Sequence, residues 1–386
     1  MEIEIGRGKK ARRAYGFDDI AIVPSRRTRD AEDVDIGWKL GPYLLELPLL
    51  ASAMDGVVSP MTAIELGKLG GLAVLNLEGI WTRFEDADAQ LKAIAAAPVK
   101  EATAMMQKIY QEPIKPELIA KRVKEIKDAG VLVAASLTPQ RVTEFHSFAL
   151  EAGLDVMVIQ GTVVSAEHVS TVVEPLNLKE FIAKLPIPTI VGGCASYQTA
   201  LHLMRTGAAA VLVGVGPGAA CTTRGVLGVG VPQATAIADA AAARVQNLIE
   251  TGTYCNVIAD GGMRTGGDIA KAVACGADAV MVGSPLSRAH EAPGGGYHWG
   301  MATFHPTLPR GARVQTNQVA SLKEIVLGPA FENDGTLNLM GALRTSMATT
   351  GYETIHDFQK AEIMFAPALM TEGKKLQREQ NVGMSK

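Results

Sequence analysis

The chain has 386 residues, a formal net charge of −3 at pH 7, and a composition that is 47% hydrophobic but only 5% aromatic. The charge balance gives no extended basic surface for a nucleic acid or an anionic membrane, and no uncharged apolar stretch reaches the length of a membrane span. Because the first residues are charged and four cysteines show no metal-binding spacing, we expect a cytoplasmic protein with reduced thiols and no signal peptide.

Eight short apolar runs recur along the chain, separated by segments with helical periodicity. In chain order they are Leu47–Ala53, Leu72–Leu77, Val131–Leu137, Asp155–Gln160, Pro188–Gly193, Ala209–Gly214, Asn256–Asp260 and Ala279–Gly283. Continuous apolar strands that alternate with helices indicate parallel strands buried on both faces. Eight such units in this length predict an α/β fold, a closed (β/α)8 or TIM barrel, with residues 1–386 as a single domain.

Three stretches repeat the same order of a helix, a stop that contains glycine, and a strand that ends in glycine. They are Tyr197–Gly214, Gly266–Gly283 and, more loosely, Phe145–Gly161. Glycine just past the last helical turn is a common C-cap. An open doubly wound sheet has the same alternation of strands and helices and is the alternative fold. It is disfavoured because the count reaches eight and no GxGxxG motif follows the first run.

Polar and small residues follow several of these runs, at the end of the barrel where such folds carry their chemistry. In chain order they are Ser52, Met54, Cys221, Asp260, Gly261, Gly262, Gly283 and Ser284. The positions after the seventh and eighth strands commonly hold a phosphate through backbone N–H groups. Asp260 can accept two hydrogen bonds from a ribose diol, and a turn or N-cap aspartate is the alternative interpretation.

Cys221 lies in the run GPGAACTTR, from Gly216 to Arg224, directly after the sixth apolar run. Glycine lets the backbone approach a ligand closely, and an exposed thiol near positive charge is a good nucleophile. A buried, inert thiol in a glycine turn is the alternative. Cys194 is the competing nucleophile but lacks the flanking threonines and arginine, and Cys255 and Cys275 fit packing positions.

A long loop is predicted after the eighth run, over residues 287–320, with the three glycines 294–296 as a hinge. Long irregular segments inside compact domains commonly act as lids, so we expect a mobile active-site flap. Three histidines of this loop have spacings that fit no metal-binding motif, namely His290, His298 and His305. Residues 369–386 are expected to form a polar C-terminal tail.

Five blocks of the sequence stand out as a set that spans most of the chain. They are YGFDDIAIVPS (Tyr15–Ser25), LPLLASAMDGV (Leu47–Val57), GVGPGAACTTRGVLGVGVPQATAI (Gly214–Ile237), VIADGGMRTGGDIAKAVACGADAVMVGS (Val257–Ser284) and HEAPGG (His290–Gly295). In this order they resemble the IMP dehydrogenase and GMP reductase family. The resemblance implies a homotetramer that acts on purine nucleotides, with NAD and a potassium ion as cofactors.

The resemblance also implies roles for single positions. Cys221 would attack C2 of the purine nucleotide, hydride would pass to the nicotinamide cofactor, and Thr223 would help water to release the product. Asp260 would hold the ribose hydroxyls. The other positions matched to the substrate are Ser52, Met54, Gly261, Gly262, Gly283, Ser284, His298, Gly300, Met301 and Ala302. Asn76, Gly161 and Gly214 match cofactor positions, and the carbonyls of Gly216, Gly218 and Cys221 match a potassium site.

Several positions depart from the family pattern. Residues 81–130 are a charged, helix-like stretch where some members insert a pair of cystathionine-synthase-type (CBS) domains, so we expect no regulatory module. The run MVIQ, Met157–Gln160, replaces an aspartate-and-serine cluster that contacts the cofactor ribose in relatives. Gly193 stands in place of an asparagine, and Ala219 in place of a phosphate-binding serine.

The flap sequence MATFHPTLPRGARVQ, Met301–Gln315, lacks the Arg-Tyr pair that activates water in the dehydrogenase. Arg310 and His305 are the candidates for that task. An arginine is normally protonated, so we expect Arg310 to position the water together with Thr223 rather than to act as a base.

Three functions stay open at this point. The motifs SAMDGV, GVGVPQ and EAPG resemble the dehydrogenase branch of the family more closely. They favour an NAD-dependent IMP dehydrogenase, which oxidises IMP to XMP in guanine nucleotide biosynthesis. The missing Arg-Tyr pair and the missing regulatory module favour a GMP reductase, which deaminates GMP to IMP with NADPH. The altered cofactor region also leaves a nucleotide-binding homologue with weak turnover. The dehydrogenase is the function we expect.

Overall fold

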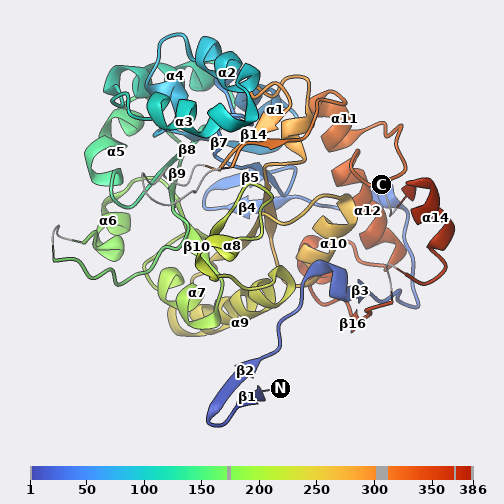
Figure 1. Ribbon diagram of the computed structural model, residues 1–386. Helices are drawn as coiled ribbons and strands as arrows, with labels where there is room; N and C mark the ends of the chain where they lie inside the picture. The colour runs from blue at the N-terminus through green and yellow to red at the C-terminus, as the bar shows by residue number, and fades with distance from the viewer. Residues whose placement is uncertain (1, 172–174, 301–311, 369–370, 384–386) are drawn as a thin grey trace.

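In the computed structural model, which describes residues 2–171, 175–300, 312–368 and 371–383, eight parallel strands close into a barrel (Figure 1). They are β6 (Leu49–Ala51), β7 (Leu72–Asn76), β8 (Ala134–Leu137), β9 (Val156–Gln160), β10 (Thr189–Cys194), β11 (Ala210–Val213), β12 (Asn256–Asp260) and β13 (Ala279–Val282). Each strand pairs with the next along the chain, and β13 pairs with β6. The predicted TIM barrel is confirmed, since each predicted apolar run overlaps one of these strands.

The continuous apolar runs arise because both faces of each barrel strand are buried. In β9, Val156 and Val158 pack inside the barrel, whereas Met157 and Ile159 pack against the surrounding helices. Successive side chains of a strand point to opposite faces, so a strand between a filled interior and a layer of helices needs apolar residues at every position.

The amino end of the barrel is closed by a hairpin of β4 (Trp38–Leu40) and β5 (Tyr43–Leu45). Trp38, Leu40 and Leu45 join the apolar cluster that fills the barrel interior. The Trp38 indole N–H donates to the carbonyl of Leu47 at 3.0 Å, so its polar atom is paired inside this plug. The opposite, carboxyl end is the end left for a ligand.

Helices surround the barrel and return the chain from one strand to the next. The principal ones are α1 (Pro60–Lys68), α4 (Pro116–Asp128), α5 (Val142–Glu151), α6 (Leu178–Lys184), α7 (Tyr197–Met204), α9 (Gln233–Thr251), α10 (Gly266–Ala274) and α12 (Leu339–Thr349). In the three repeated stretches, Gly153, Gly207 and Gly276 follow the helix with φ of 97°, 90° and 116°. These left-handed positions favour glycine, which confirms the predicted helix stops.

Further elements lie between and beyond these units. The remaining helices are α2 (Ala87–Ala96), α3 (Val99–Ile109), α8 (Thr223–Leu227), α11 (Leu322–Leu327), α13 (Ile355–Phe358) and α14 (Lys375–Gln380). The remaining strands form three antiparallel pairs, β1 (Glu2–Gly6) with β2 (Lys9–Arg12), β3 (Ile20–Ile22) with β16 (Ile363–Phe365), and β14 (Tyr297–His298) with β15 (Val314–Gln315). The expected helix-like stretch at residues 81–130 therefore consists mainly of α2, α3 and α4.

The segment predicted as an irregular loop over residues 287–320 is partly regular where the structure describes it. β14 and β15 pair in the register Tyr297 with Gln315 and His298 with Val314, and His298 and Trp299 are each 1% exposed. Gly294 packs so closely on the chain that an added Cβ would lie 2.0 Å from the Tyr297 carbonyl oxygen. The predicted glycine hinge is therefore a tight turn, and the described ends of the segment are part of the protein's packed wall.

Two peripheral segments leave the barrel. The β1–β2 hairpin projects away from it (Figure 1), and the ion pair of Arg12 with Asp239 at 2.7 Å links its base to α9. In the predicted polar tail, α14 buries no residue. Among the residues that the structure describes, no helix combines the length and the apolar character that crossing a membrane requires.

Candidate active site

A cavity of about 1080 Å³ opens at the carboxyl end of the barrel. Its wall includes residues that follow β6, β8, β9, β11, β12 and β13, together with the β14–β15 region. Of the predicted site residues, those in the wall are Ser52, Met54, Gly161, Gly214, Gly216, Gly218, Cys221, Thr223, Asp260, Gly261, Gly262, Gly283, Ser284, His298 and Gly300. Met301, Ala302, His305 and Arg310 lie outside the described residues.

Asn76 is the predicted site residue that the structure does not bring to this cavity. It ends β7, is 3% exposed, and accepts a hydrogen bond from the Glu78 backbone N–H at 3.0 Å through its side-chain oxygen. This local contact stabilises the turn after the strand, as asparagine side chains commonly do. The position therefore has a structural explanation, and a part for Asn76 in cofactor binding stays a prediction.

Cys221 is the one cysteine of the four that lines the cavity, and all four lie in the described residues. Its thiol donates to the Thr223 hydroxyl oxygen at 3.2 Å, and its backbone N–H donates to the Gly218 carbonyl at 3.0 Å. The side chain is half-buried, directly before α8, whereas Thr223 is fully buried. The arrangement holds a nucleophilic atom against the open space of the cavity.

The other three thiols have surroundings that oppose reactivity. Cys194 is 1% exposed in β10, and burial raises the pKa of its thiol to about 12. Burial also raises the pKa of Cys255 and raises that of Cys275 to about 12. A thiol rather than a thiolate is a poor nucleophile, so the structure favours Cys221 over its competitor Cys194.

Arg224 braces the loop that carries Cys221. Its guanidinium donates to the carbonyls of Val215 at 3.3 Å and Val231 at 2.6 Å. Its aliphatic stem packs on Gly216 and Gly230, where an added Cβ would lie 2.6 Å and 2.7 Å from the Arg224 Cγ. These two glycines are therefore needed for close packing, and the arginine fixes the shape of the loop.

Asp260 ends β12 and faces the cavity, where two glutamines contact it, one from strand β9 and one from helix α9. The Gln160 amide, at the end of β9, donates to Asp260 Oδ2 at 3.1 Å. The Gln233 amide, at the start of α9, donates to the carbonyls of Val213 and Asp260 at 3.1 Å and of Gly261 at 3.2 Å. Burial raises the pKa of Asp260 to about 7, and the Gln160 hydrogen bond opposes that rise.

The loops after β12 and β13 have the backbone shape of an anion site. Gly261 and Gly262 have φ of 77° and 81°, and an added Cβ on Gly262 would lie 2.9 Å from Pro217. At Gly283 an added Cβ would lie 2.6 Å from the sulfur of Met54. Side chains are excluded at these points. The Gly261 N–H donates to the Met281 carbonyl at 3.0 Å, which leaves the N–H groups of Gly262 and Gly283 for an anion at the cavity wall.

His298 connects the loop after β13 to the β14–β15 region. One ring nitrogen lies 2.8 Å from the Ser284 hydroxyl and the other 3.4 Å from the Ser287 hydroxyl, which is itself 2.9 Å from the Thr316 hydroxyl. Burial lowers the pKa of His298 to about 4, so the ring is neutral at neutral pH. A neutral imidazole keeps Ser284 oriented without adding a charge to the wall.

Two contacts join the β14–β15 region to the α2–α3 pair. The Trp299 indole donates to the Tyr110 hydroxyl at 2.7 Å, and that hydroxyl donates to the buried carboxylate of Asp55 at 2.5 Å. Burial raises the pKa of Asp55 to about 6. Arg313 donates to the carbonyls of Ile94, Ala95 and Ala97, at the end of α2. A cation there also complements the helix dipole.

Sequence reasoning missed several residues of the cavity wall. They are Asp18, Gln160, Gln233, Arg264, Arg288, Thr316, Asp334 and Thr336. Gln160 and Gln233 had a signal, since one ends a predicted strand at a departure from the family and the other lies in a matched block. Asp18 and Arg264 also lie in matched blocks, and Arg288 and Thr316 lie in the predicted loop 287–320. Asp334 and Thr336 come from a segment where spacing along the chain gives no indication of the cavity.

Comparison with known proteins gives a consistent picture. The model of a family described as "IMP dehydrogenase / GMP reductase domain" matches residues 14–375. An uncharacterized oxidoreductase of Mycobacterium leprae is 48% identical over 371 residues, which cover 94% of this chain and 99% of the relative. The inosine-5'-monophosphate dehydrogenase of Methanocaldococcus jannaschii is 28% identical, with 74% of each chain covered.

A solved structure is similar over almost the whole chain. It is described as an IMP dehydrogenase/GMP reductase-like protein from Corynebacterium glutamicum, and it is 44% identical in sequence. The match covers 94% of this chain and 97% of that one, with a TM-score of 0.90. The similarity therefore includes the barrel and the segments around its carboxyl end.

Proposed function

Because the chain belongs to the IMP dehydrogenase / GMP reductase family, we propose that it is an NAD-dependent oxidoreductase that converts inosine 5'-monophosphate to xanthosine 5'-monophosphate. The observation that carries the proposal is the placement of Cys221, which alone of the four cysteines reaches the cavity. Asp260 and the glycine loops after β12 and β13 line the same space. A nucleophile, a ribose acceptor and an anion site thus share one wall.

Binding of the nucleotide distributes its parts over the strand ends. The phosphate takes the backbone N–H groups of Gly262 and Gly283, because the Gly261 N–H already donates to the Met281 carbonyl at 3.0 Å, and His298 holds Ser284 in place. The ribose diol donates to the carboxylate of Asp260, which as an ionised group is an acceptor only. The purine then lies toward Cys221, whose loop follows β11.

The chemical step begins with loss of the thiol proton to solvent water in the open cavity, because the Thr223 hydroxyl accepts a hydrogen bond from the thiol but is too weak a base to take the proton. The sulfur forms a bond to C2 of the purine while the hydride leaves C2, and NAD, when bound, supplies the acceptor for that hydride. A covalent link through Cys221 remains. Splitting a difficult substitution into two steps in this way is the usual advantage of a covalent intermediate.

Water completes the reaction by adding to C2 and releasing the Cys221 thiol. Thr223 is in hydrogen-bond contact with that sulfur at 3.2 Å, so its hydroxyl is placed to orient the attacking water. We propose that Arg310, outside the described residues, assists Thr223. If so, Arg310→Ala should give a full initial burst of reduced cofactor followed by slow turnover. Loss of the burst itself would place Arg310 in substrate binding.

The cavity, of about 1080 Å³, extends past the residues assigned to the nucleotide as far as the ends of β8 and β9. At the ends of β8 and β9 its wall is formed by Thr138–Gln140 and Gln160–Val163, which carry no charged side chain. This end suits the nicotinamide part of NAD, with Gly161 against it. Gly214 is required next to the Asp260 carbonyl, 2.1 Å from an added Cβ.

The Cys221 loop also suits a potassium ion. The carbonyl oxygens of Gly216 and Cys221 accept no hydrogen bond from another described residue, and Gly218 accepts one, from the Cys221 N–H. Unpaired backbone carbonyls favour a hard cation. Bound there, the ion would hold the loop in shape. Replacing potassium by lithium in the assay should lower turnover, and unchanged turnover would remove the ion from the proposal.

We further propose that the chain forms a homotetramer, as its resemblance to the family led us to expect. Val245 and Ile249 lie one turn apart on α9 and are 55% and 74% exposed. Exposed apolar side chains on one helical face are the kind of surface that association covers. Light scattering at working concentration tests this, and a monomer would contradict it.

A GMP reductase is the second candidate, because α2, α3 and α4 occupy the stretch where some relatives insert a regulatory module. Absorbance of the reduced nicotinamide separates the functions. Reduced cofactor that forms with IMP and NAD supports the dehydrogenase, and NADPH that is consumed with GMP supports the reductase. If neither absorbance change occurs but the protein binds the nucleotide, the protein is a binding protein without turnover.

A further inference from the structure

One hydrogen bond crosses the mouth of the barrel between strands that are not neighbours. Gln160 ends β9 and Asp260 ends β12, with β10 and β11 between them in the barrel. The amide Nε2 of Gln160 donates to Oδ2 of Asp260 at 3.1 Å and lies 4.0 Å from the sulfur of Met281. Both side chains line the cavity. The contact therefore ties two distant parts of the wall together at the predicted ribose acceptor.

The backbone of Asp260 is fixed by a different residue. Gln233 donates its amide to the carbonyls of Asp260 and Gly261, as well as to that of Val213. Gln233 is 4% exposed and begins α9. Removing the Gln160 amide would thus leave the main chain in place and free only the carboxylate to rotate.

The carboxylate depends on this single partner for its orientation. Among the described residues, no donor other than Gln160 reaches the Asp260 carboxylate. The last torsion of an aspartate is broad, so an unheld carboxylate samples many angles. Donation by the amide also favours the ionised form, which accepts hydrogen bonds from two hydroxyl groups. The carbonyl oxygen of the Gln160 amide is buried and has no hydrogen-bond partner among the described residues. The orientation of the amide is therefore set by its hydrogen bond to Asp260.

We propose that Gln160 is a positioning residue that orients Asp260 toward a ribose diol and thereby makes the site prefer ribonucleotides over 2'-deoxyribonucleotides. The inference rests on the proposed function, since it assumes that a purine nucleotide binds with its ribose at Asp260. It assigns to this chain's own glutamine a task that no local motif indicated. The preference follows from geometry, because a carboxylate held at one angle can face both hydroxyls of the diol together.

Two substitutions at this position separate the amide from the shape of the side chain. Gln160→Met keeps the length and removes the donor. Gln160→Glu keeps the shape but places a second carboxylate at hydrogen-bond distance from Asp260, where like charges repel. Gln246→Met is the matched control, because Gln246 on α9 also donates its amide to a carboxylate, that of Glu250 at 2.8 Å, away from the cavity.

The experiment measures calorimetric binding of IMP and of 2'-deoxy-IMP, together with kcat and KM for both, on the purified full chain. For Gln160→Met we expect the dissociation constant and the KM for IMP to rise about tenfold, while kcat changes less than about threefold. The preference for IMP over 2'-deoxy-IMP should fall about tenfold. Gln160→Glu should bind IMP more weakly still. Gln246→Met should retain the wild-type preference. Circular dichroism and thermal melting confirm that each variant folds.

The outcomes separate this inference from the function on which it rests. If the wild-type protein binds IMP but Gln160→Met keeps both the affinity and the preference, the positioning role is wrong and the proposed function stands. If Gln160→Met lowers binding of both nucleotides equally, Gln160 contributes general packing and the inference is overturned. If the wild-type protein binds no purine nucleotide, the proposed function fails first, and this inference fails with it.

Discussion

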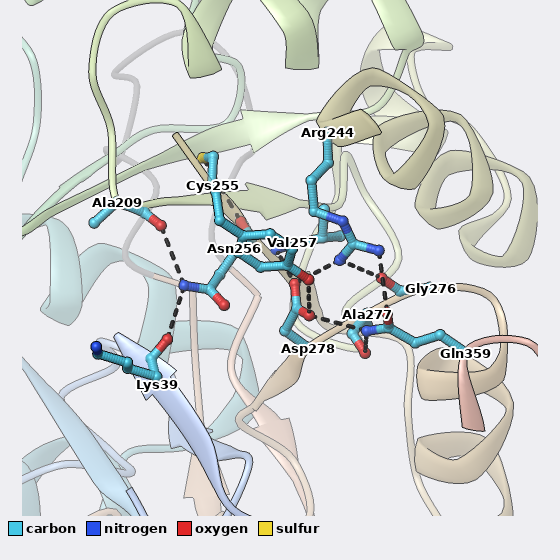
Figure 2. A network of polar contacts seen from close by, with 11 residues as sticks. Lys39, Ala209, Arg244, Cys255, Asn256, Val257, Gly276, Ala277, Asp278 and Gln359 are labelled. Atoms are coloured by element: carbon cyan, nitrogen blue, oxygen red, sulfur yellow. Dashed lines mark hydrogen bonds and ion pairs between the residues drawn. The ribbon is translucent and has the colours of Figure 1, made fainter. Parts of the chain in front are cut away.

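Two aspartates at opposite ends of the barrel have very different surroundings. Asp278 precedes β13 at the amino end, and its two carboxylate oxygens accept four hydrogen bonds. Figure 2 labels three of the donors, Arg244, Val257 and Gln359. The donors are Arg244 and Val257 at 2.7 Å, Tyr254 at 2.7 Å and Gln359 at 2.9 Å. Asp260, at the carboxyl end of β12, accepts one, from Gln160.

The amino-end network around Asp278 is closed in itself. Arg244 also donates to Gly276 and Gln359, and Gln359 donates to Ala277, so these groups pair with one another and with the backbone. A buried carboxylate with its charge partner and its hydrogen bonds complete has nothing left for a ligand. Asp260 keeps acceptor capacity free in a cavity. The difference shows that one end of this barrel uses polar residues for stability and the other keeps them available for binding.

The largest expected effect is at the carboxyl end. Cys221→Ala should lower turnover by at least about a thousandfold, because the nucleophile is lost, yet it should retain nucleotide binding, which depends on other strands. Iodoacetamide should label Cys221 first, and bound nucleotide should protect it. Cys194→Ala is the control, since that thiol is buried away from the cavity. Normal turnover in Cys221→Ala with none in Cys194→Ala would reverse the assignment.

At the amino end the same kind of test should affect stability and not chemistry. Arg244→Ala leaves the buried carboxylate of Asp278 without its charge partner, which should cost about 3–5 kcal/mol of unfolding free energy. The kcat of the folded protein should stay near the wild-type value. Lys360→Ala, which removes an exposed ion pair with Asp357, should change stability by less than about 1 kcal/mol. Urea unfolding and kcat, measured on the same preparations, test the contrast. Loss of kcat without loss of stability would place Arg244 in function.

The pKa of Asp260 predicts a dependence on pH that Asp278 should not share. Burial raises the Asp260 pKa from 3.8 to about 7, so the protonated form, which is the weaker acceptor, dominates below that pH. The dissociation constant for IMP should therefore rise as the pH falls, approaching about tenfold per pH unit. Asp260→Asn should bind weakly at all pH values and retain only the dependence that arises from the phosphate of the ligand. If the pH profile of this variant matches that of the wild-type protein, Asp260 does not bind the ribose.

The raised pKa of Asp260 also makes the stability of the folded protein depend on pH. The folded protein holds the Asp260 proton more tightly than the unfolded chain does, so the contribution of this group to stability is largest at acid pH. It declines as the pH rises from about 4 to about 7. Asp260→Asn should remove that decline, which chemical unfolding at several pH values would measure.

The smallest effect is expected where the β14–β15 region meets α2. Arg313→Ala removes the hydrogen bonds to the carbonyls of Ile94, Ala95 and Ala97, and His298 and Thr316 should then be held less firmly in the cavity wall. We expect KM for the nucleotide to rise about threefold to tenfold with a smaller change in kcat. Arg205→Ala, which breaks an outer-surface pair with Glu250, is the control. Equal effects of the two variants would argue against a role for Arg313 in the wall.

Much of the barrel could be predicted from neighbouring residues alone. A strand such as β9 needs apolar side chains on both faces, and that requirement is written in consecutive residues, Val156 to Ile159. The glycine stops at Gly153, Gly207 and Gly276 are likewise local, because each depends on one residue's backbone angle. The strand ends then placed Cys221, Asp260 and Ser284 at one end of the barrel, and the cavity there contains all three.

The contacts that distinguish this site depend on residues far apart in the sequence. Gln160 meets Asp260 across 100 positions, and Trp299 meets Tyr110 across 189. Periodicity cannot reveal such pairs, since they form only when the barrel closes and brings the strand ends and outer segments together. The sequence determined the strands, the helix stops and which end carries the chemistry. The tertiary structure decided which polar groups at that end are paired, and that Asn76 belongs to a turn, because pairing depends on distance in space.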